Sequence, residues 1–272
     1  MSKITLLFFL LSGFCSSSQE IISVLKVRGH DENISFKNLA SSKLSSLPFF
    51  DDFSNSTISN NNWTDRSIFI NNSYAINPIS SGVATFDGLD SNGFAYDISV
   101  TSSYGVADYL TSREIDISNL DSIFLMFFYQ PQGVGDFPQN QDSLVLEFLD
   151  DSLNWNRVWA INGGSYYPFE KKVIFINDNK FLHQNFRFRF FNYATLSGNF
   201  DHWNLDYVLL DKFNSVSDTN ELNDVAFVGK HGSLLKRYTQ MPWKHFLNNE
   251  STELADSIDI PIRNNDASIN VD

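Results

Sequence analysis

Short apolar segments recur through most of this chain, and turn-forming residues separate them. The pattern is clearest where three phenylalanines, Phe186, Phe188 and Phe190, alternate with Arg187 and Arg189. Successive side chains of a strand point to opposite faces, so this alternation predicts a Phe row facing a core and an Arg row facing water or a groove. Similar segments, bounded by Gly, Asn, Asp, Ser or Pro, lie at 67–70, 82–87, 108–110, 122–130, 142–149, 155–161, 172–177, 185–193 and 203–210.

One segment departs from alternation, because 123–129 is apolar throughout, as a central strand covered on both faces would be. Nowhere in 47–213 does the sequence show the period of an amphipathic helix of three turns. The composition, with 26 Phe against 3 Met, also favours strands. We therefore predict an all-β fold, a two-sheet antiparallel jelly-roll sandwich.

The apolar pattern also divides the chain into four regions. An apolar run at 4–11, too short to span a bilayer, follows Lys3 and precedes a small polar stretch, which predicts a signal peptide over 1–18. We expect an extended arm at 19–46, the sandwich at 47–213, and a linker with an incomplete second β segment at 214–272. One strand near 257–263 cannot bury itself, so the tail either pairs back onto the sandwich or opens a second β-domain.

Charge and cysteine content narrow the setting of the protein. A net charge of −13 gives no electrostatic footprint for nucleic acid or anionic lipid. The single cysteine, Cys15, lies in the predicted signal peptide, so we expect the mature chain to have no disulfide. Cleavage would also remove the apolar run at 4–11, and we expect no membrane span after it. These features predict an exported bacterial protein, at the outer membrane surface or extracellular, with the periplasm as the alternative.

Two patterns suggest catalysis, and both are incomplete. Asp201 and His202 adjoin, but the chain has no G-x-S-x-G nucleophile turn, so we interpret His202 as structural. Glu114 and Asp116 match the start of the E-I-D-x-E pattern of jelly-roll glycoside hydrolases, but Ser118 stands where the acid/base carboxylate is needed. We predict a protein that is not an enzyme, with a degenerate glycoside hydrolase as an alternative.

Two groups of oxygen-bearing side chains could hold a structural Ca²⁺ ion. Asp87, Asp90 and Asn92 lie in one glycine-flanked turn, and a plain Asx turn is the alternative interpretation of this cluster. Asp52 and Asp206 would meet if the first and last strands of the sandwich are neighbours, and a shared cation would then join the two ends. A strand-capping role is the alternative for this pair.

Aromatic residues around the turn 162–164 could form a ligand surface. Trp155, Trp159, Tyr166 and Tyr167 are the candidates, since aromatic rings stack on sugar rings and on peptide side chains. Trp155 and Trp159 are four residues apart, so on one regular strand they would share a face. Packing in the core is the alternative.

Finally, the chain resembles a known group of modules over 47–213. The resemblance rests on LPFFDDFS, SGVATFDGLDSNGFAYD, SLVLEFLDDSLNWNRVWAING and FRFRFFNYATLSGNFDHWNLDYVLLD. It is to the MAM-like or choice-of-anchor jelly-roll module of exported Bacteroidota proteins, which usually end in a type IX secretion sorting domain. Such a domain would lie beyond Asp272, so we expect this chain to be part of a larger protein.

The resemblance implies a non-catalytic adhesion or carbohydrate-binding module. Its partner would be a glycan or a surface or envelope protein, and Ca²⁺ would be bound near the paired terminal strands, at Asp52 and Asp206. A structural component of a type IX secretion or gliding apparatus is a further alternative, with the arm and the tail docking on partners.

Overall fold

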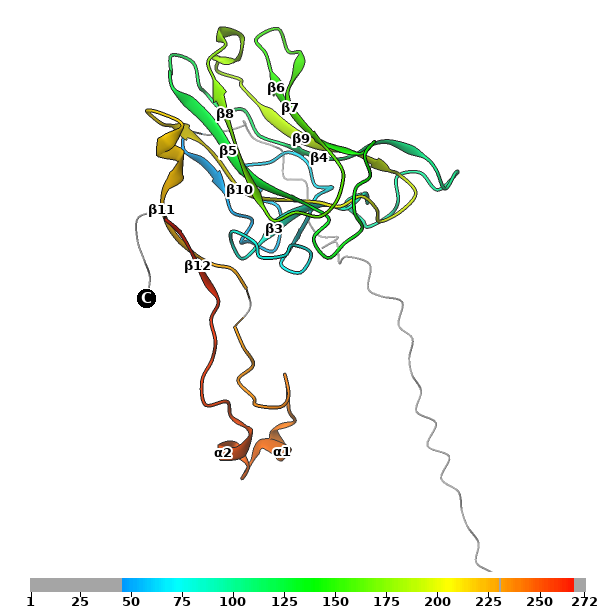
Figure 1. Cartoon of the computed structure of the whole chain (residues 1–272), viewed down its shortest axis with the longest axis vertical. Coiled ribbons are helices and arrows are strands. Elements are labelled where there is room, and N and C mark those ends of the chain that lie inside the picture. The colour runs from blue at the N-terminus through cyan, green and yellow to red at the C-terminus, as the bar shows by residue number, and fades with distance from the viewer. Residues whose placement is uncertain (1–45, 230, 267–272) are drawn as a thin grey trace, which may run out of the picture.

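The computed structural model describes residues 46–229 and 231–266, and its main body is an antiparallel β-sandwich of jelly-roll type (Figure 1). One sheet has the order β2-β3-β10-β5-β8, with β1 also paired to β10, and the other has the order β4-β9-β6-β7. The strands of the sandwich are β1 Phe49–Asp51, β2 Phe69–Asn71, β3 Val83–Phe86, β4 Tyr104–Thr111, β5 Ile123–Pro131, β6 Ser143–Leu149, β7 Trp155–Asn162, β8 Glu170–Ile176, β9 Phe188–Thr195 and β10 Trp203–Lys212. The predicted fold class is confirmed, while the signal peptide and nearly all of the predicted arm lie outside the described residues.

Each apolar segment expected from the sequence overlaps a strand, and β4 is the one whose length differs most. It runs over Tyr104–Thr111, whereas the pattern marked only 108–110. The reason is a bulge, because Val106 pairs with Tyr193 and Tyr109 with Phe191, so two residues of β4 face one of β9. A bulge shifts the alternation by one position and so hides a strand from a period-two reading.

The core lies between the two sheets and is rich in phenylalanine. Leu146 and Phe148 of β6 and Phe188 and Phe190 of β9 are fully buried in it, as the alternation predicts. Phe190 meets Phe127 of the opposite sheet edge-to-face, with 4.8 Å between ring centroids. Burying one such side chain stabilises the fold by about 1.5–3 kcal/mol, so this layer accounts for the cohesion of the two sheets.

Strand β5 is covered on both faces, as its unbroken apolar run predicts. Leu125 and Phe127 point into the main core. Met126 points to the other side, where it packs in a second small cluster with Ile79 and Tyr207. This outer face of the first sheet is therefore largely occupied by the protein's own side chains.

The segment that begins with Asp201 and His202 leads into a central strand. Strand β10 pairs with β5 along one edge and with β1 and β3 along the other. Its register against β5 shifts between Asp206 and Leu209, and Tyr207 has a positive φ of 53° there.

Strands β11 (Glu221–Phe227) and β12 (Ile262–Asp266) pair with each other and form a ribbon that leaves the sandwich, with α1 (Trp243–Phe246) and α2 (Glu250–Glu253) at its far end (Figure 1). Two short 3-10 turns, η1 (Asn179–Phe181) and η2 (Ser217–Asn220), complete the elements of the part that the structure describes. The ribbon contacts the sandwich where Asn265 Nδ2 donates to the carbonyl oxygen of Ile79 at 3.4 Å. Over the residues that the structure describes, no helix has the length and apolar character needed to cross a bilayer.

Candidate functional site

The outward side of the second sheet carries a group of aromatic rings, which we call the aromatic face. It consists of Tyr104 and Tyr109 of β4, Phe191 and Tyr193 of β9, and Trp155 of β7. Because Phe188 and Phe190 point into the core, Phe191 and Tyr193 point outward at their places in β9, and cross-strand pairing puts the β4 residues beside them. Tyr104 is 45% exposed, and Tyr109, Trp155 and Tyr193 are half-buried.

The rings of the aromatic face form a chain of contacts across two strands. Tyr104 stacks on Tyr193 with 6.4 Å between centroids, Tyr193 meets Phe191 at 5.6 Å, and Phe191 meets Tyr109 at 5.6 Å. Cross-strand aromatic pairs of this kind each stabilise a sheet by roughly 0.2–1 kcal/mol. Such packing holds the rings in fixed orientations. Less side-chain entropy is therefore lost when a ligand binds.

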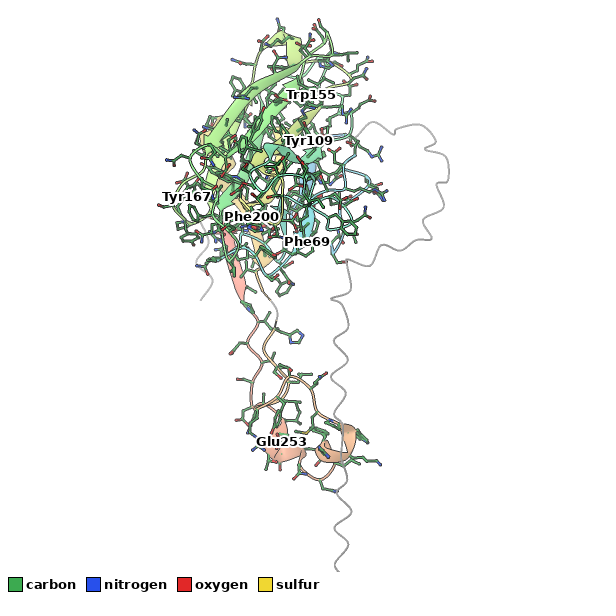
Figure 2. All side chains as sticks on the ribbon, turned by 90° about the vertical axis from the view of Figure 1, so that its right-hand side faces the viewer. Phe69, Tyr109, Trp155, Tyr167, Phe200 and Glu253 are labelled. Carbon is green, nitrogen blue, oxygen red and sulfur yellow. The ribbon has the colours of Figure 1, made fainter. Side chains whose placement is uncertain are left out.

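An ion pair lies at the centre of the same surface. Nη2 and Nε of Arg189 donate to Oε2 of Glu147 at 2.7 and 2.9 Å. The guanidinium carbon lies 4.2 Å from the Trp155 ring centroid and 5.3 Å from that of Tyr109, so one cation joins rings from β7 and β4. Tyr109 and Trp155 accordingly lie close together in Figure 2. The surface thus combines stacking rings with groups that can donate and accept hydrogen bonds.

The two tryptophans of β7 lie on opposite faces, so the expectation that they share one is wrong. Leu146 pairs with Trp159 and Glu147 with Arg157, which leaves Val158 as an extra residue in β7. This bulge reverses the alternation, so Trp155 points outward to Arg189. Trp159 points inward, where its ring lies 5.2 Å from Phe127 and 4.9 Å from Tyr129.

The two tyrosines predicted beside these tryptophans also have different surroundings. Tyr167 packs on the main core with its ring 6.1 Å from Tyr129, and burial raises the pKa of its hydroxyl to about 12. Tyr166 is 39% exposed in the loop after β7. Of the four predicted ligand-binding residues, the structure places only Trp155 on the aromatic face.

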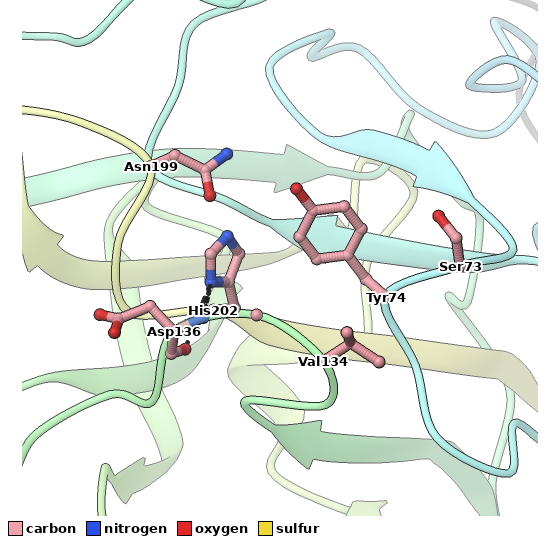
Figure 3. Close-up of a pocket in the computed structure, with 7 residues that line it drawn as sticks. Ser73, Tyr74, Val134, Asp136, Asn199 and His202 are labelled. Carbon is pink, nitrogen blue, oxygen red and sulfur yellow. Dashed lines mark hydrogen bonds between the residues drawn. The ribbon is translucent and has the colours of Figure 1, made fainter.

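A cleft of about 460 Å³ lies at one end of the sandwich, between the loop after β5 and the turn before β10 (Figure 3). The ring of His202 forms part of its wall, and the ring of Tyr74 lies 5.2 Å away. Figure 3 shows the outer side of the imidazole facing Asn199 and Tyr74. The lining residues are Ser73, Tyr74, Val134, Gly135, Asp136, Asn199 and His202.

The hydrogen bonds of His202 determine what it can do in this cleft. The backbone N–H of Asp136 donates to Nδ1 at 2.7 Å, which is shorter than the 3.2 Å between Nδ1 and the Asp136 main-chain oxygen, so the contacts favour the neutral ring with its hydrogen on Nε2. Burial lowers the pKa of His202, which favours this neutral form. A ring with its hydrogen on Nε2 has no lone pair there to take a proton from a serine nucleophile, and Nε2 itself is buried without a hydrogen-bond partner. The arrangement does not suit the triad role.

The other candidate catalytic pair, Glu114 and Asp116, lies outside regular strand structure. Asp116 is exposed, and its carboxylate accepts hydrogen bonds from the backbone N–H and the hydroxyl of Ser118 at 3.0 and 2.6 Å. These bonds lower the pKa of Asp116. Ile115 and Ile117, on either side, are buried in the main core. Asp116 thus closes an Asx turn.

Asp206, predicted to share a cation with Asp52, is fully buried and surrounded by hydrogen-bond donors. Its Oδ2 accepts from the backbone N–H groups of Ile79 and Ser80, both at 2.9 Å, and its Oδ1 lies 2.8 Å from the Ser80 hydroxyl. That hydroxyl also lies 2.6 Å from the main-chain oxygen of Asp52, while the Asp52 carboxylate accepts from Ser54. Burial raises the pKa of Asp206 to about 7. A cation at this pair stays a prediction.

The second predicted Ca²⁺ group is divided between two environments. Asp87 is buried, and its charge adds to the burial that raises the pKa of Asp108 to about 7. Asp90 lies in the turn itself, where its carboxylate accepts from the backbone N–H groups of Asn92 and Phe94 at 2.8 and 2.9 Å. Within residues 46–229 and 231–266, there is no group of three or more His, Cys, Asp or Glu side chains that could hold a metal ion. Calcium at this turn also stays a prediction.

Most residues of the aromatic face were not singled out by sequence patterns. The Arg row of β9 was expected to face water or a groove, and continuing its alternation past Arg189 leads to Phe191 and Tyr193. That signal was present in the sequence. Tyr104 and Tyr109 could not be found in the same way, because the bulge between them breaks the alternation of β4.

Comparisons with known proteins give only weak likenesses. No family model matches the sequence, and no curated protein does. The K3 cleaved adhesin domain of Lys-gingipain from Porphyromonas gingivalis matches with a TM-score of 0.32 and 12% identity, over 49% of this chain and 75% of that one. The CBM27-1 module of Caldicellulosiruptor saccharolyticus, solved with mannohexaose, matches with a TM-score of 0.36 and 11% identity, over 61% and 92%.

The xylan-binding CBM22-1 domain of Paenibacillus barcinonensis Xyn10C matches with a TM-score of 0.35 and 9% identity, over 60% of this chain and 91% of that one. Likenesses at this level do not bear on what this chain binds. The resemblance to MAM-like and choice-of-anchor modules stays a prediction.

Proposed function

We propose that this protein is an exported, non-catalytic module that binds a glycan on the aromatic face. The observation that carries the proposal is the combination of Tyr104, Tyr109, Trp155 and Tyr193 with the central Arg189–Glu147 pair. Sugar rings present apolar C–H faces and a rim of hydroxyls, so they match a surface of flat rings with hydrogen-bonding groups among them. The apolar N-terminal segment supports export to the cell surface.

The geometry favours a chain of sugars over a single one. Tyr104 and Tyr193 lie at one end of the aromatic face, and Trp155 lies beyond Arg189, three strands away from β4. A ligand that touched both ends would cross β4, β9, β6 and β7. Several stacking contacts in a row would suit an oligosaccharide, with each ring contributing modestly.

The test begins with a glycan array probed with the full chain, followed by titration calorimetry on the best ligand. Tyr109→Ala and Tyr193→Ala should each weaken binding by about twofold to twelvefold, because one aromatic contact contributes about 0.5–1.5 kcal/mol. Phe175→Ala is the matched control, since Phe175 is 46% exposed on the other sheet. Equal losses in all three variants, or no binding to any glycan, would overturn the proposal.

A second candidate function is docking of the C-terminal ribbon on an envelope protein. Phe227 of β11 and Ile262 of β12 are paired and are 63% and 50% exposed, so the ribbon presents apolar side chains to solvent. If the ribbon docks, Phe227→Asp should abolish co-purification of one stoichiometric partner from the outer membrane. Retention of that partner by the variant would count against this role.

A further inference from the structure

Two buried carboxylates lie at the loop end of the sandwich. Asp142 comes just before β6, and Asp201 lies in the turn that precedes β10. Both residues are fully buried. The charged groups that act most on Asp142 are Asp201 and Asp136, which are both acidic. Buried charges of like sign are costly unless something compensates them.

Each of these carboxylates accepts a backbone hydrogen bond at one oxygen, and its other oxygen has no hydrogen-bond partner. The backbone N–H of Gln139 donates to Oδ2 of Asp142 at 2.5 Å, and that of Thr195 donates to Oδ2 of Asp201 at 2.7 Å. Oδ1 of Asp142 and Oδ1 of Asp201 are both buried and have no hydrogen-bond partner. Ser143 pairs with Tyr193 of β9, so Asp142 lies opposite Ala194, next to Thr195, which binds Asp201. Two fixed oxygens, on residues that neighbour each other, therefore lack a positive partner.

We propose that Asp142 and Asp201 together bind one Ca²⁺ ion between the start of β6 and the turn before β10. Ca²⁺ takes six to eight oxygen ligands, so carboxylates would supply part of the shell and main-chain oxygens or water the rest. Zn²⁺ fits poorly, since it prefers nitrogen or sulfur ligands and Nδ1 of the adjacent His202 already accepts a backbone hydrogen bond.

The ion would lie between the two surfaces described above. The Tyr104 hydroxyl donates to the main-chain oxygen of Gln141, the residue before Asp142, which places this ring of the aromatic face beside the pair. Burial and the charges of Asp142 and Asp201 also raise the pKa of that hydroxyl. On the other side, Asp201 adjoins His202 in the wall of the cleft. Ca²⁺ would thus fix two loops and orient Tyr104, and the inference stands whether or not a glycan binds.

A shared proton is the competing explanation, because burial, together with the neighbouring Asp201, raises the pKa of Asp142 to about 7. The two explanations predict different responses to Asp142→Asn. An asparagine replaces a protonated carboxyl group well, so the variant would be as stable as the wild type or more so. It replaces a calcium ligand poorly, because the charge is lost.

The experiment uses the full chain without glycan, with Tb³⁺ luminescence excited through tyrosine and melting curves in Ca²⁺ or EGTA. We expect tyrosine-sensitised Tb³⁺ emission that Ca²⁺ displaces, and a melting temperature that EGTA lowers. Asp142→Asn and Asp201→Asn should each weaken Ca²⁺ binding at least tenfold and remove the EGTA effect. Asp90→Asn and Asp206→Asn, at the other predicted calcium residues, should leave both readouts unchanged.

Several outcomes would overturn the proposal. Absence of any Ca²⁺ or EGTA effect on the wild type would do so, and it needs no variant to fold. Undiminished Ca²⁺ binding by Asp142→Asn, or its loss in Asp90→Asn or Asp206→Asn instead, would place the ion elsewhere.

Discussion

The bulge in β7 makes a sharp prediction, because it assigns opposite roles to two tryptophans only four residues apart. Trp159→Ala removes a ring that packs against Phe127 and Tyr129 in the core. Core tryptophan-to-alanine changes cost about 3–5 kcal/mol, and the half-buried position of Trp159 favours the lower end, about 3 kcal/mol. Trp155→Ala removes mainly the contact with Arg189, worth about 0.5–1 kcal/mol at a half-exposed site.

These figures translate into melting temperatures that are easy to separate. For a domain of this size, about 1 kcal/mol shifts the melting temperature by about 2–4 °C. Trp159→Ala should therefore lower it by about 6–12 °C, and Trp155→Ala by no more than about 4 °C. Calorimetry and urea unfolding should agree on this order, with the denaturant slope unchanged.

Glycan binding should show the reverse order. Trp155→Ala should weaken binding, while the milder Trp159→Phe should leave it near the wild-type level. If the two alanine variants lose equal stability, or if Trp155→Ala is the less stable one, then Trp159 is not the buried ring of the two. The assigned register of β7 would then be wrong.

Three further predictions concern buried groups. The folded state keeps a proton on Asp206 up to about pH 7, whereas the unfolded chain loses it near pH 4, so the free energy of unfolding falls as pH rises between these values, by at most about 1.4 kcal/mol per pH unit from this group. Asp206→Asn should therefore make the free energy of unfolding, measured with urea, less dependent on pH across that window. An unchanged pH dependence would refute the protonated form. Gly135→Ala would place a Cβ 2.4 Å from Nδ1 of His202, so it should lower the melting temperature and perturb the His202 resonances, whereas Gly164→Ala, whose Cβ would meet nothing closer than 4.0 Å, should be tolerated; equal effects would contradict the packing of the cleft. Asp51→Ala would leave the buried Nε1–H of Trp63 without its acceptor at 2.7 Å and should cost about 1–3 kcal/mol in chemical unfolding, so a neutral result would refute that bond.

The fold could be predicted from the sequence because its strands alternate cleanly where they face one core. The Phe row of β9 and the leucines of β6 are buried as expected, and the unbroken apolar run of β5 has a cover on both faces. These signals depend on local pattern alone, which is why they survive without any knowledge of the partners of each strand.

The candidate site could be predicted only in part, for a physical reason. Bulges in β4 and β7 each add one residue, so spacing along the chain no longer tells which face a side chain takes. Trp159 was assigned to the wrong face for this reason. The pairing of Asp142 with Asp201 depends on how the loops after β5 and β9 meet, and no local pattern encodes such a long-range contact.

The most direct test of the central claim is an NMR titration of the isotope-labelled chain with the glycan that binds best. If the aromatic face is the binding site, backbone amide shifts should be largest at 104–109, 143–147 and 189–193, with the Trp155 indole N–H among the resonances that move most. Resonances of the first sheet, such as those of 170–176, should stay in place. Shifts confined to the cleft around His202, or to the C-terminal ribbon, would contradict the claim.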